Sequence, residues 1–424
     1  MPPLSESRAM RFITFGALYF AQGVPWGFIA VGFVVFLTDL GLDNTAVGSA
    51  LGLAYLPWSF KVVFGPLIDR FPSRRWGRRR PFIITAELGM GLSMLALLLV
   101  SPAEQLGWLS AVLFIHNVFA AMQDVAVDAL AVDVLEPDER GRANSVMWAC
   151  KSAGVAAGGG GGTVIAKHLG WNGLFVLIAV LILAIMVLVV LVRERTAPRD
   201  GESVAEDLKL SWKELKRSFN FATPLVGLAA SMVTVVGTAL TIAVFTRTIR
   251  AELAFSAETI GVISGVLEPV SGVIGALIGG VVADRVGVRR AMGGFMAVCA
   301  LALLAFSFML HGAPSPTEVA VFVAIHHGAF YAFNAAALGF YMTMSNPAIG
   351  ATHFAVFMAG TNLTYAWASP AGGMIADRWG VATTYLVAAG LQLLAVGILP
   401  FCDPEVAERR FRATNQAEAP TRAV

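Results

Sequence analysis

Long apolar stretches separated by short polar turns make up most of the sequence. Each stretch holds roughly 20 residues, enough for a helix to cross about 30 Å of hydrocarbon. The pattern therefore predicts an all-α membrane protein with twelve transmembrane helices. These helices are expected near residues 11–37, 46–67, 81–100, 107–132, 143–167, 171–192, 221–246, 257–282, 291–310, 317–343, 353–376 and 380–401.

One long polar segment divides this series of helices. It is RERTAPRDGESVAEDLKLSWKELKRSFN, residues 193–220, which we interpret as a linker. We therefore expect an N-terminal six-helix bundle over 1–192, a C-terminal six-helix bundle over 221–402 and a tail over 403–424. Lys and Arg gather in the linker, in the tail and in the turn after the second helix, so the positive-inside rule places the linker and both termini in the cytoplasm.

The second half of the sequence repeats the first. GPLIDRFPSRRWGRRR, after the second predicted helix, is echoed by GGVVADRVGVRR after the eighth. Two further matches, both 210 residues apart, pair His116 with His326 and Gly170 with Gly380. A duplicated bundle is typical of transporters whose two halves enclose a site near the membrane midplane.

The composition excludes several classes of protein. The chain of 424 residues is 57% hydrophobic and only 14% charged, with a mean hydropathy of +0.72, whereas soluble domains carry about 25% charged residues. A net charge of +2 gives no indication of a nucleic-acid partner. The three scattered cysteines suggest neither disulfides nor a metal site, and the sequence has no GK[ST] phosphate loop. We expect no enzymatic activity, no cofactor and no metal.

The turn after the second helix carries a recognisable motif. GPLIDRFPSRRWGRRR resembles the motif between helices 2 and 3 of the major facilitator superfamily, and its weaker copy after helix 8 lies where that superfamily repeats it. More narrowly, AQGVPWGF, LPWSFKVVFGPLIDR and QDVAVDALAVDVLEPDERG resemble the peptide, acetyl-coenzyme A and drug transporter branch, in its muropeptide-permease-like members. The resemblance spans most of the N-terminal half. The muropeptide-permease type carries additional membrane helices beyond the twelve predicted here.

By this resemblance the turn acts as a gate latch that holds one conformation of the transporter. The residues assigned to the gate are Gly65, Asp69, Arg70, Asp133 and Arg140, with Asp284 and Arg285 in the second copy. Asp133 lies near the cytoplasmic end of its helix, where it can meet the Arg78–Arg80 cluster or Arg140. Anchoring of positively charged loops in the cytosol accounts for the remaining arginines.

Four charged residues fall inside the apolar runs of the first half. Asp124 and Asp128 are four positions apart and share a helix face. A rise of about 1.5 Å per residue places Asp124 near the midplane, with Asp128, Lys61 and Lys151 at neighbouring depths. An unpaired charge at the bilayer centre costs at least about 2.5 kcal/mol, so these groups face partners or a wet cavity. Either they bind an anionic part of a solute, with Asp124 taking up a proton, or they form ion pairs that only join helices, the interpretation we favour for Asp128 with Lys151.

The second half carries fewer charges inside the membrane. Asn334 matches Asp124 in the repeat, and Glu268 lies deep in the eighth helix. Glu268 or His326 could titrate near neutral pH if buried, whereas a hydrogen-bonded interior histidine is the alternative. In the superfamily helices 1, 4, 7 and 10 line the cavity, which implies contacts from helices 1 and 10. The candidate substrate-binding or coupling residues are Gln22, Lys61, His116, Asp124, Asp128, Lys151, Glu268, His326, Tyr331 and Asn334.

Glycines and tryptophans carry structural predictions. GVAAGGGGG, residues 154–162 in the fifth helix, weakens the helix by up to about 1 kcal/mol per glycine but permits close helix contact in lipid. We expect this helix to cross a neighbour tightly and to bend. Its copy SPAGGM in the eleventh helix adds Pro370, which predicts a kink. We expect Trp58, Trp108 and Trp171 in the aromatic belt at the membrane interface.

A function follows from these expectations. No ATP-binding motif is present, so transport draws on a gradient; carboxylates and histidines favour protons, with uniport as an alternative. We predict a monomeric secondary active transporter in a bacterial inner membrane, working by alternating access, that imports with protons a polar or anionic solute of the muropeptide, peptide or siderophore class. A non-transporting assembly factor or sensor of the same fold and a drug or lipid efflux carrier stay open as alternatives, and the midplane charges favour transport.

Overall fold

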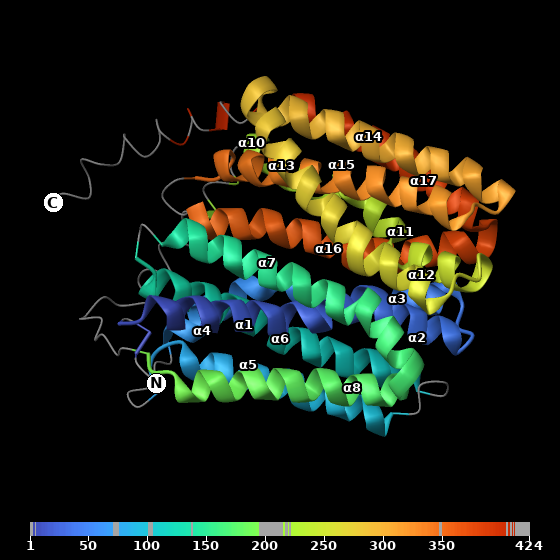
Figure 1. Cartoon of the computed structure of the whole chain (residues 1–424). Helices are drawn as coiled ribbons and strands as arrows, with labels where there is room; N and C mark the ends of the chain where they lie inside the picture. Colours follow the sequence, from blue (N-terminus) through green and yellow to red (C-terminus); the bar gives the residue numbers. More distant parts are fainter. Residues whose placement is uncertain are drawn as a thin grey trace. The chain divides into compact units, whose positions relative to one another are not determined.

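The computed structural model is helical throughout the residues that it describes. Its helices confirm the expected all-α class, and the isolated bridge between Pro3 and Arg193 is the single extended pairing in this part of the chain (Figure 1). The described residues are 3–4, 6–70, 76–100, 105–136, 139–194, 215–216, 219, 222–346, 350–403, 406–407, 409 and 411.

The chain forms two compact units. The first comprises Met1–Glu202, Ile242–Pro269 and Ser369–Met374, and the second comprises Ser203–Thr241, Val270–Ala368 and Ile375–Val424. Two short segments from the second half of the sequence therefore belong to the first unit. The predicted boundaries of the bundles, the linker and the tail stay predictions, and most of the linker, residues 195–214, lies outside the described residues.

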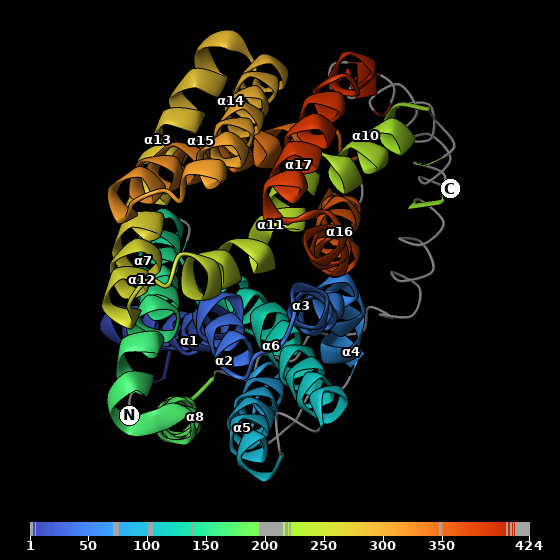
Figure 2. The ribbon, with the colours of Figure 1, turned by 90° about the vertical axis from the view of Figure 1, so that its right-hand side faces the viewer.

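The first unit is a bundle of long helices. Its helices are α1 (Arg8–Gly27), α2 (Phe33–Asp39), α3 (Asn44–Ser59), α4 (Phe64–Arg70), α5 (Arg80–Ala96), α6 (Leu106–Val134), α7 (Arg140–Gly158), α8 (Gly160–Leu191) and α12 (Ala257–Val262). Helix α1 packs against α7, α3 packs against α6, and α5 packs against both α6 and α8 (Figure 2). Because α6 contacts α1, α3, α4 and α5, its side chains meet groups from most of the bundle.

The second unit contains most of the remaining helices. They are α10 (Ala222–Val233), α11 (Val236–Arg247), α13 (Glu268–Val286), α14 (Val288–Met309), α15 (Pro316–Thr343), α16 (Gly350–Trp379) and α17 (Val381–Val396), of which α11, α13 and α16 extend into the first unit. Helix α14 packs against α15 and α17. The core of the unit is apolar and includes Met292, Phe340 and Phe357, each fully buried.

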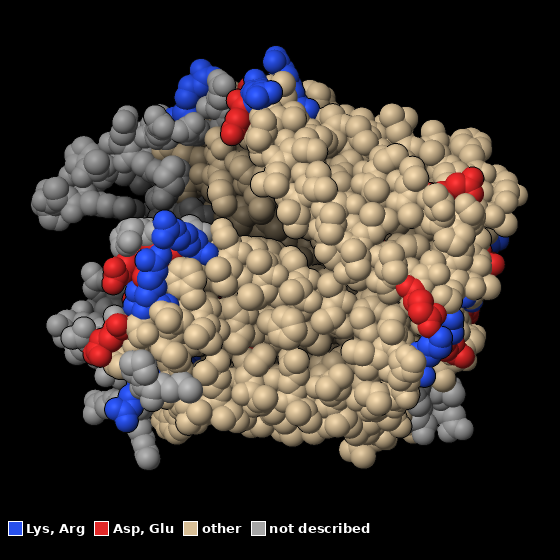
Figure 3. All heavy atoms as spheres, in the orientation of Figure 1, with Lys and Arg blue, Asp and Glu red and all other residues tan. Residues whose placement is uncertain are grey.

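The helices have the length and composition of membrane spans. Ten helical segments among the described residues are long and apolar enough to cross a membrane. The longest, Arg142–Leu191, has 50 residues and contains Gly170 in a non-helical conformation, whereas α16 is not among the ten. The count of twelve crossings and the cytoplasmic termini stay predictions. On the face shown in Figure 3 the charged side chains gather towards helix ends and leave the middle of the helices uncharged.

Backbone conformation repeats at the spacing that the sequence repeat predicts. Gly170 and Gly380 both have positive φ, 70° and 88°, and each interrupts or begins a helix. Gly77 and Gly287, which are also 210 residues apart, have φ of 94° and 88° in the turns before α5 and α14. Only glycine adopts such angles without strain, so both halves use the same turn chemistry.

The glycines of α7 permit a tight crossing with α1, as the sequence predicts. A Cβ at Gly158 would lie 1.8 Å from the carbonyl oxygen of Val24, and one at Gly154 would lie 2.5 Å from that of Phe20. The helix breaks at Gly159, with φ −80° and ψ −98°, before α8 begins. Close backbone approach thus holds the two helices together at a level where larger side chains have no room.

Candidate functional site

A break in the second membrane segment positions Lys61. Helix α3 contains Pro57, which has no backbone N–H to donate to the preceding turn, and the helix ends two residues later at Ser59. A 3₁₀ turn, η2 (Lys61–Val63), follows before α4 begins at Phe64. The break places Lys61 between two short helices rather than along one straight helix. Its side chain is partly buried, with 30% exposure.

Asp124 on α6 is the centre of a charged cluster inside the first unit. Its Oδ2 lies 3.1 Å from Nζ of Lys61, and its Oδ1 lies 3.9 Å from Nζ of Lys151 on α7. Gln22 on α1 donates from Nε2 to Oδ1 at 2.9 Å. The carboxylate is buried, so its charge is balanced by two ammonium groups and an amide rather than by bulk water. The structure brings together four of the predicted residues from four segments of the chain.

Asp128 does not pair with Lys151, and that prediction was wrong. Asp128 instead accepts a hydrogen bond from the hydroxyl of Tyr19. The ammonium of Lys151 lies over the rings of Trp148, Tyr19 and Trp58, with Nζ 5.2, 5.6 and 5.9 Å from the ring centroids. Cation–π contacts of this length stabilise a cation away from water. Asp124 and Asp128 share one face of α6, and their separation of four residues, about 6 Å along the helix, places Asp124 rather than Asp128 next to the ammonium of Lys151.

Trp58 also departs from its prediction. It is buried rather than interfacial, and its indole Nε1 donates to Oδ1 of Asn117 at 2.8 Å. Its ring packs edge-on against Trp26 with centroids 5.0 Å apart, and Nζ of Lys61 lies 6.0 Å from its centroid. Trp58 therefore forms an aromatic wall beside both lysines. Trp108, by contrast, is 69% exposed.

Two buried residues next to the cluster were missed by the sequence analysis. Gln123 accepts from Nε2 of Gln22 at 2.9 Å, and its own Nε2 donates to Oε1 of Glu87 on α5 at 3.0 Å. Glu87 is fully buried. A signal was present in the sequence, because Glu87 is the only charged residue between Pro81 and Val100, and an ionisable residue inside a membrane span is by default a functional candidate.

The two candidate histidines are buried and make contacts with residues other than those of the Asp124 cluster. His116 is buried against α5, with Nδ1 2.9 Å from Oγ of Ser93. His326 in the second unit is buried between Phe322 and Phe330, whose rings stack with its imidazole at 5.4 and 6.4 Å. These surroundings correspond to interior histidines held by packing and hydrogen bonds, the alternative that we raised from the sequence.

The remaining candidates make local contacts. Asn334 donates from Nδ2 to the carbonyl of Phe330 one turn earlier, at 2.9 Å. Glu268 accepts from the hydroxyl of Ser264 at 3.1 Å. Tyr331 is 45% exposed. Asn334 and Tyr331 belong to the second unit and the Asp124 cluster to the first. The roles of Asn334, Glu268 and Tyr331 in binding stay predictions.

Asp133, one of the predicted gate residues, lies in a second polar region at the start of α5. Nε of Arg79 lies 3.0 Å from Oδ2 of Asp133, one of the contacts expected from the sequence. Arg80 donates to the last carbonyls of α8, with Nη2 2.8 Å from the oxygen of Val190, which also complements the negative end of that helix. The side chain of Glu194 accepts from the backbone N–H groups of Arg78, Arg79 and Arg80.

Other gate assignments are only partly visible. The side chains of Asp69, Arg70 and Arg140 lie outside the described residues. Asp284 and Arg285 are exposed near the end of α13. The latch role of the whole set therefore stays a prediction.

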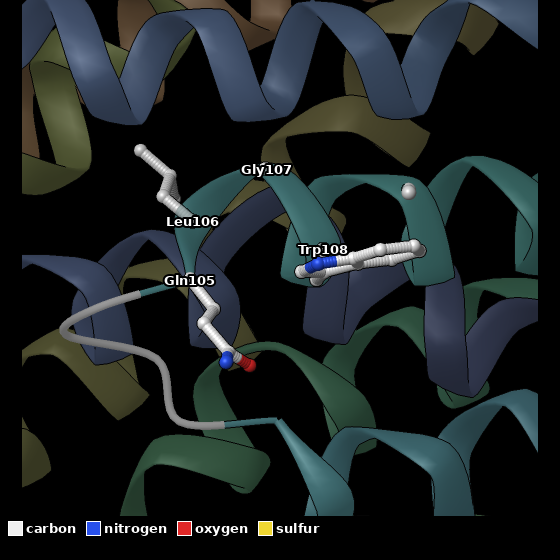
Figure 4. Close-up of a pocket in the computed structure, with 5 residues that line it drawn as sticks. Gln105, Leu106, Gly107 and Trp108 are labelled. Atoms are coloured by element: carbon white, nitrogen blue, oxygen red, sulfur yellow. The ribbon is translucent and has the colours of Figure 1, made fainter.

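Two surface hollows lie away from the cluster. One, of about 590 Å³, lies at the start of α6 beside Gln105, Leu106 and Trp108, more than ten residues from Asp124. Leu106 and Gln105 point to opposite sides there, and Trp108 lies along the outside of the helix (Figure 4). Among the described residues that line this hollow, Gln105 and the indole of Trp108 are the only polar side chains, so this lining does not resemble a site for a polar solute.

The second hollow, of about 330 Å³, is lined by two ion pairs of the first unit. Nε of Arg250 lies 2.7 Å from Oδ1 of Asp39, and Lys167 pairs with Glu258. The four side chains are paired with one another, Lys167 and Glu258 being about half exposed and Arg250 and Asp39 about one-third exposed. Among the described residues that line this hollow, no charge is left over to select a solute. The Asp124 cluster is therefore the stronger candidate for binding.

The cluster can exchange ligands in a defined way. While Asp124 is ionised, it holds both ammonium groups of Lys61 and Lys151. Protonation of Asp124 would remove that attraction and leave two cations beside an aromatic wall, where an anionic group could bind.

Comparison with known proteins places this arrangement in a family. The sequence matches the Major Facilitator Superfamily over residues 15–247 and 226–423. The chain belongs to that superfamily. As a Major Facilitator Superfamily protein it is a multi-pass membrane transporter, and the resemblance inferred from the helix 2 to 3 motif is confirmed.

Individual relatives of this superfamily member agree. The anhydromuropeptide permease of Escherichia coli K12 is 26% identical over 402 residues, covering 91% of this chain and 78% of the permease. Among solved structures, the nucleoside transporter NupG superposes with a TM-score of 0.72 at 14% identity, covering 92% of this chain and 98% of that one. The D-xylose-proton symporter superposes with a TM-score of 0.70 at 14% identity, covering 92% and 96%. At such identity the two structures show the fold alone.

Proposed function

We propose that the protein is a proton-coupled secondary transporter that imports an anionic, sugar- or peptide-containing solute of the muropeptide, peptide or siderophore class across a bacterial inner membrane by alternating access. The solute's anionic group binds Lys61 and Lys151, and Asp124 is the carboxylate that holds the two ammonium groups in the absence of solute. The observation that carries this proposal is the convergence of the two ammonium groups on one buried carboxylate.

The cost of burial supports a functional interpretation of this cluster. Each charge taken out of water loses several kcal/mol of solvation, roughly, and an ion pair repays that loss only with good geometry. Lys151 lies 3.9 Å from Asp124, longer than a direct hydrogen bond, so its charge is balanced incompletely by that carboxylate. A structural network would be expected to use the shorter geometry. The second lysine is instead positioned to accept a further anion.

The aromatic residues beside the lysines favour a solute with flat or ring-shaped parts. Trp148 is 56% exposed next to Lys151, and Trp26 and Trp58 form the wall behind. Apolar faces with a few polar groups are the usual composition of small-molecule sites. The relative from Escherichia coli is named an anhydromuropeptide permease, and a muropeptide combines sugar rings with carboxylates, as this site would require.

Uptake into proteoliposomes tests the proposal. A labelled anhydromuropeptide and, in parallel, a ferric siderophore are offered with and without an inward proton gradient to the wild type and to Asp124→Asn. Glu318→Gln is the matched control, because Glu318 is an exposed carboxyl that caps α15 and an amide also fits a capping box. We expect gradient-driven uptake by the wild type and the control, and none by Asp124→Asn.

Other results would change the assignment. Uptake that Asp124→Asn leaves intact would reduce the cluster to structural ion pairs. Failure of the wild type to move either solute would contradict the proposed solute class. A wild type that moves apolar compounds outward, or one that copurifies with a stable partner and transports nothing, would instead support the efflux or non-transporting alternative.

A further inference from the structure

Glu87 is a buried acid that the proposed binding site does not use. It lies in α5, two turns from the start of that helix, and its side chain is fully buried. Its Oε1 accepts from Nε2 of Gln123 at 3.0 Å, and its Oε2 has no hydrogen-bond partner among the described residues. An ionised carboxylate in such a place would be very costly, whereas a neutral acid is tolerated.

No described cation faces Glu87 from the elements packed against α5. The titratable groups of α6 all face other partners. Nδ1 of His116 faces Ser93 and the carbonyl of Met90, and Asp124 pairs with the lysines. Asp128 accepts from Tyr19, and Asp133 pairs with Arg79. Helix α8 contributes no charged residue or histidine between Gly170 and Leu191. Helix α1 contributes the carbonyl of Leu18 and the amide of Gln22, which both meet Gln123. No described group thus compensates a negative charge on Glu87, so the burial of this side chain favours its neutral, protonated form.

Two glutamine amides join Glu87 to the candidate binding site. Nε2 of Gln123 donates both to Glu87 and to the carbonyl of Leu18 at 3.1 Å, which directs Oε1 of Gln123 towards Gln22. Gln22 then donates from Nε2 to Gln123 and to Asp124, at 2.9 Å each. In the series Glu87–Gln123–Gln22–Asp124, Gln22 thus donates to both of its neighbours, whereas Gln123 donates to one neighbour and accepts from the other. A change of charge on Glu87 therefore changes the strength of each hydrogen bond along the series, up to the one that Asp124 accepts.

Oε2 of Glu87 is not the only polar atom along this series without a described partner. Oε1 of Gln22 is also buried and unpartnered, and Gln22 bonds to Gln123, the donor to Glu87. Buried polar atoms normally have a protein or water partner. The series of amides therefore has unused acceptor capacity at both Glu87 and Gln22.

We propose that Glu87 carries the coupled proton, at a position separate from the site where Asp124 and the lysines bind the solute. The inference rests on the proposed function. Glu87 takes a proton from water on the outer side of the membrane onto Oε2 and releases it to cytoplasmic water, so that no bond other than O–H forms or breaks. The two amides carry the change of charge at Glu87 to Asp124, which links proton binding to the state of the lysines.

A purely structural role predicts a different response to substitution. If Glu87 only accepted a hydrogen bond from Gln123, an amide in its place would serve equally, because its carbonyl oxygen is an acceptor of the same shape. If Glu87 carries the proton, the amide keeps the hydrogen bond and loses the coupling. Glu87→Gln therefore separates the two roles, and Glu87→Asp tests whether a shorter acid restores coupling.

The experiment measures accumulation and exchange in the same proteoliposomes. With labelled anhydromuropeptide, we expect Glu87→Gln to lose accumulation driven by a proton gradient while it still exchanges internal for external solute at the wild-type rate. Glu318→Gln should retain both activities. Accumulation by Glu87→Gln with the wild-type response to the gradient would overturn the proposal. Loss of both accumulation and exchange in a folded Glu87→Gln protein would also overturn it, since that result assigns Glu87 to positioning of Gln123.

A second measurement keeps this inference separate from the proposed function. If the wild type neither accumulates nor exchanges either solute, the proposed solute class fails, and infrared spectroscopy of the purified protein tests Glu87 directly. We expect a protonated-carboxyl C=O band at neutral pH that is missing from Glu87→Gln and disappears from the wild type at alkaline pH. The absence of such a difference band would show that Glu87 is not a protonated group, and would overturn the inference.

Discussion

Lys61 Nζ meets Asp124 Oδ2 at 3.1 Å where the second membrane segment is broken after Ser59. At the break the backbone changes from α-helical to 3₁₀ hydrogen bonds, with the N–H groups of Phe60 and Val63 donating to the carbonyls of Pro57 and Phe60. Lys61 therefore lies at an interruption between α3 and α4, whereas Asp124 lies within the continuous helix α6.

Charge compensation within this pair can be tested by stability. Asp124→Asn leaves two lysines without their carboxylate, and removing one partner of a buried pair costs about 3–5 kcal/mol. Removing Lys61 as well relieves part of that cost. We expect the thermal midpoint of the purified protein to fall in Asp124→Asn and to recover partly in Asp124→Asn with Lys61→Gln. A double variant that is less stable than Asp124→Asn would show that the two residues do not compensate each other.

Sequence reasoning placed Lys61 at a depth neighbouring that of Asp124 and Asp128 because helical rise is constant, but it left open which of the two aspartates Lys61 meets. The structure shows that Lys61 meets Asp124. The same argument failed for Asp128 and Lys151, because counting residues does not resolve a difference of one helical turn, about 6 Å. The ammonium of Lys151 lies at Asp124, one turn further along α6 than the count placed it. How far each lysine side chain reaches along the membrane normal depends on tertiary packing.

Residue type misled the sequence analysis at two other positions. Trp58 has the composition of an interfacial residue, but its indole N–H finds Asn117 inside the bundle. Glu87 stood alone in an apolar run and lacked a partner in sequence, since its hydrogen-bond donor Gln123 lies in the next helix. By contrast, the repeat was predictable down to backbone conformation, because a glycine with positive φ is required in the same turn of each half.

The ion pair between Glu139 and Arg11 should make the stability of the protein depend on pH in the acid range. The guanidinium of Arg11 donates to both carboxylate oxygens of Glu139, at 2.8 and 2.6 Å, and holds the pKa of Glu139 below its usual value. Because the pKa of Glu139 is lower in the folded than in the unfolded protein, its ionised form stabilises the folded state. This contribution is complete above the ordinary glutamate pKa of about 4.3. It is lost as the pH falls through the lower pKa that Glu139 has in the folded protein. As the pH is lowered from about 4.3, we expect the thermal midpoint of the wild type to decrease more steeply than the thermal midpoint of Glu139→Gln.

Measurement at two pH values separates this effect from loss of the hydrogen bonds. Glu139→Gln should be less stable than the wild type near neutral pH, and the difference should narrow as the medium becomes acidic. Glu318→Gln serves as a control for a surface carboxyl. A stability difference that stays constant across the acid range would contradict the assigned role of Arg11 in setting the charge of Glu139.

The ion pair between Asp39 and Arg250 tests how much an exposed contact stabilises the first unit. Its side chains are about one-third exposed, and Nε lies 2.7 Å from Oδ1. Exposed pairs contribute roughly 0.2–1 kcal/mol. A double-mutant cycle with Asp39→Asn and Arg250→Gln should give a coupling energy in that range that decreases with added salt. A coupling above about 3 kcal/mol would instead indicate a pair shielded from water, as buried pairs are.

The crossing of α1 and α7 gives the sharpest steric prediction. A Cβ at Gly158 would lie 1.8 Å from the carbonyl oxygen of Val24, and backbone on both sides prevents a small side-chain shift from relieving the clash. Gly280 in α13 has a helical backbone and open space around the same position. Because alanine favours a helix over glycine by about 1 kcal/mol, Gly280→Ala should leave the thermal midpoint unchanged or raise it. Gly158→Ala should lower it strongly or prevent folding.

Transport by a folded Gly158→Ala protein completes this test. If the helices separate to admit the methyl group, Lys151 on α7 moves away from Asp124, and solute uptake should fall further than the loss of stability alone explains. Gly154→Ala, where the added Cβ would meet the carbonyl of Phe20 at 2.5 Å, should show a smaller effect of the same kind. Equal stability of Gly158→Ala and Gly280→Ala would mean that α1 and α7 do not approach as closely as the structure has them. The position of Lys151 on α7 relative to Asp124 would then not be explained by this helix crossing.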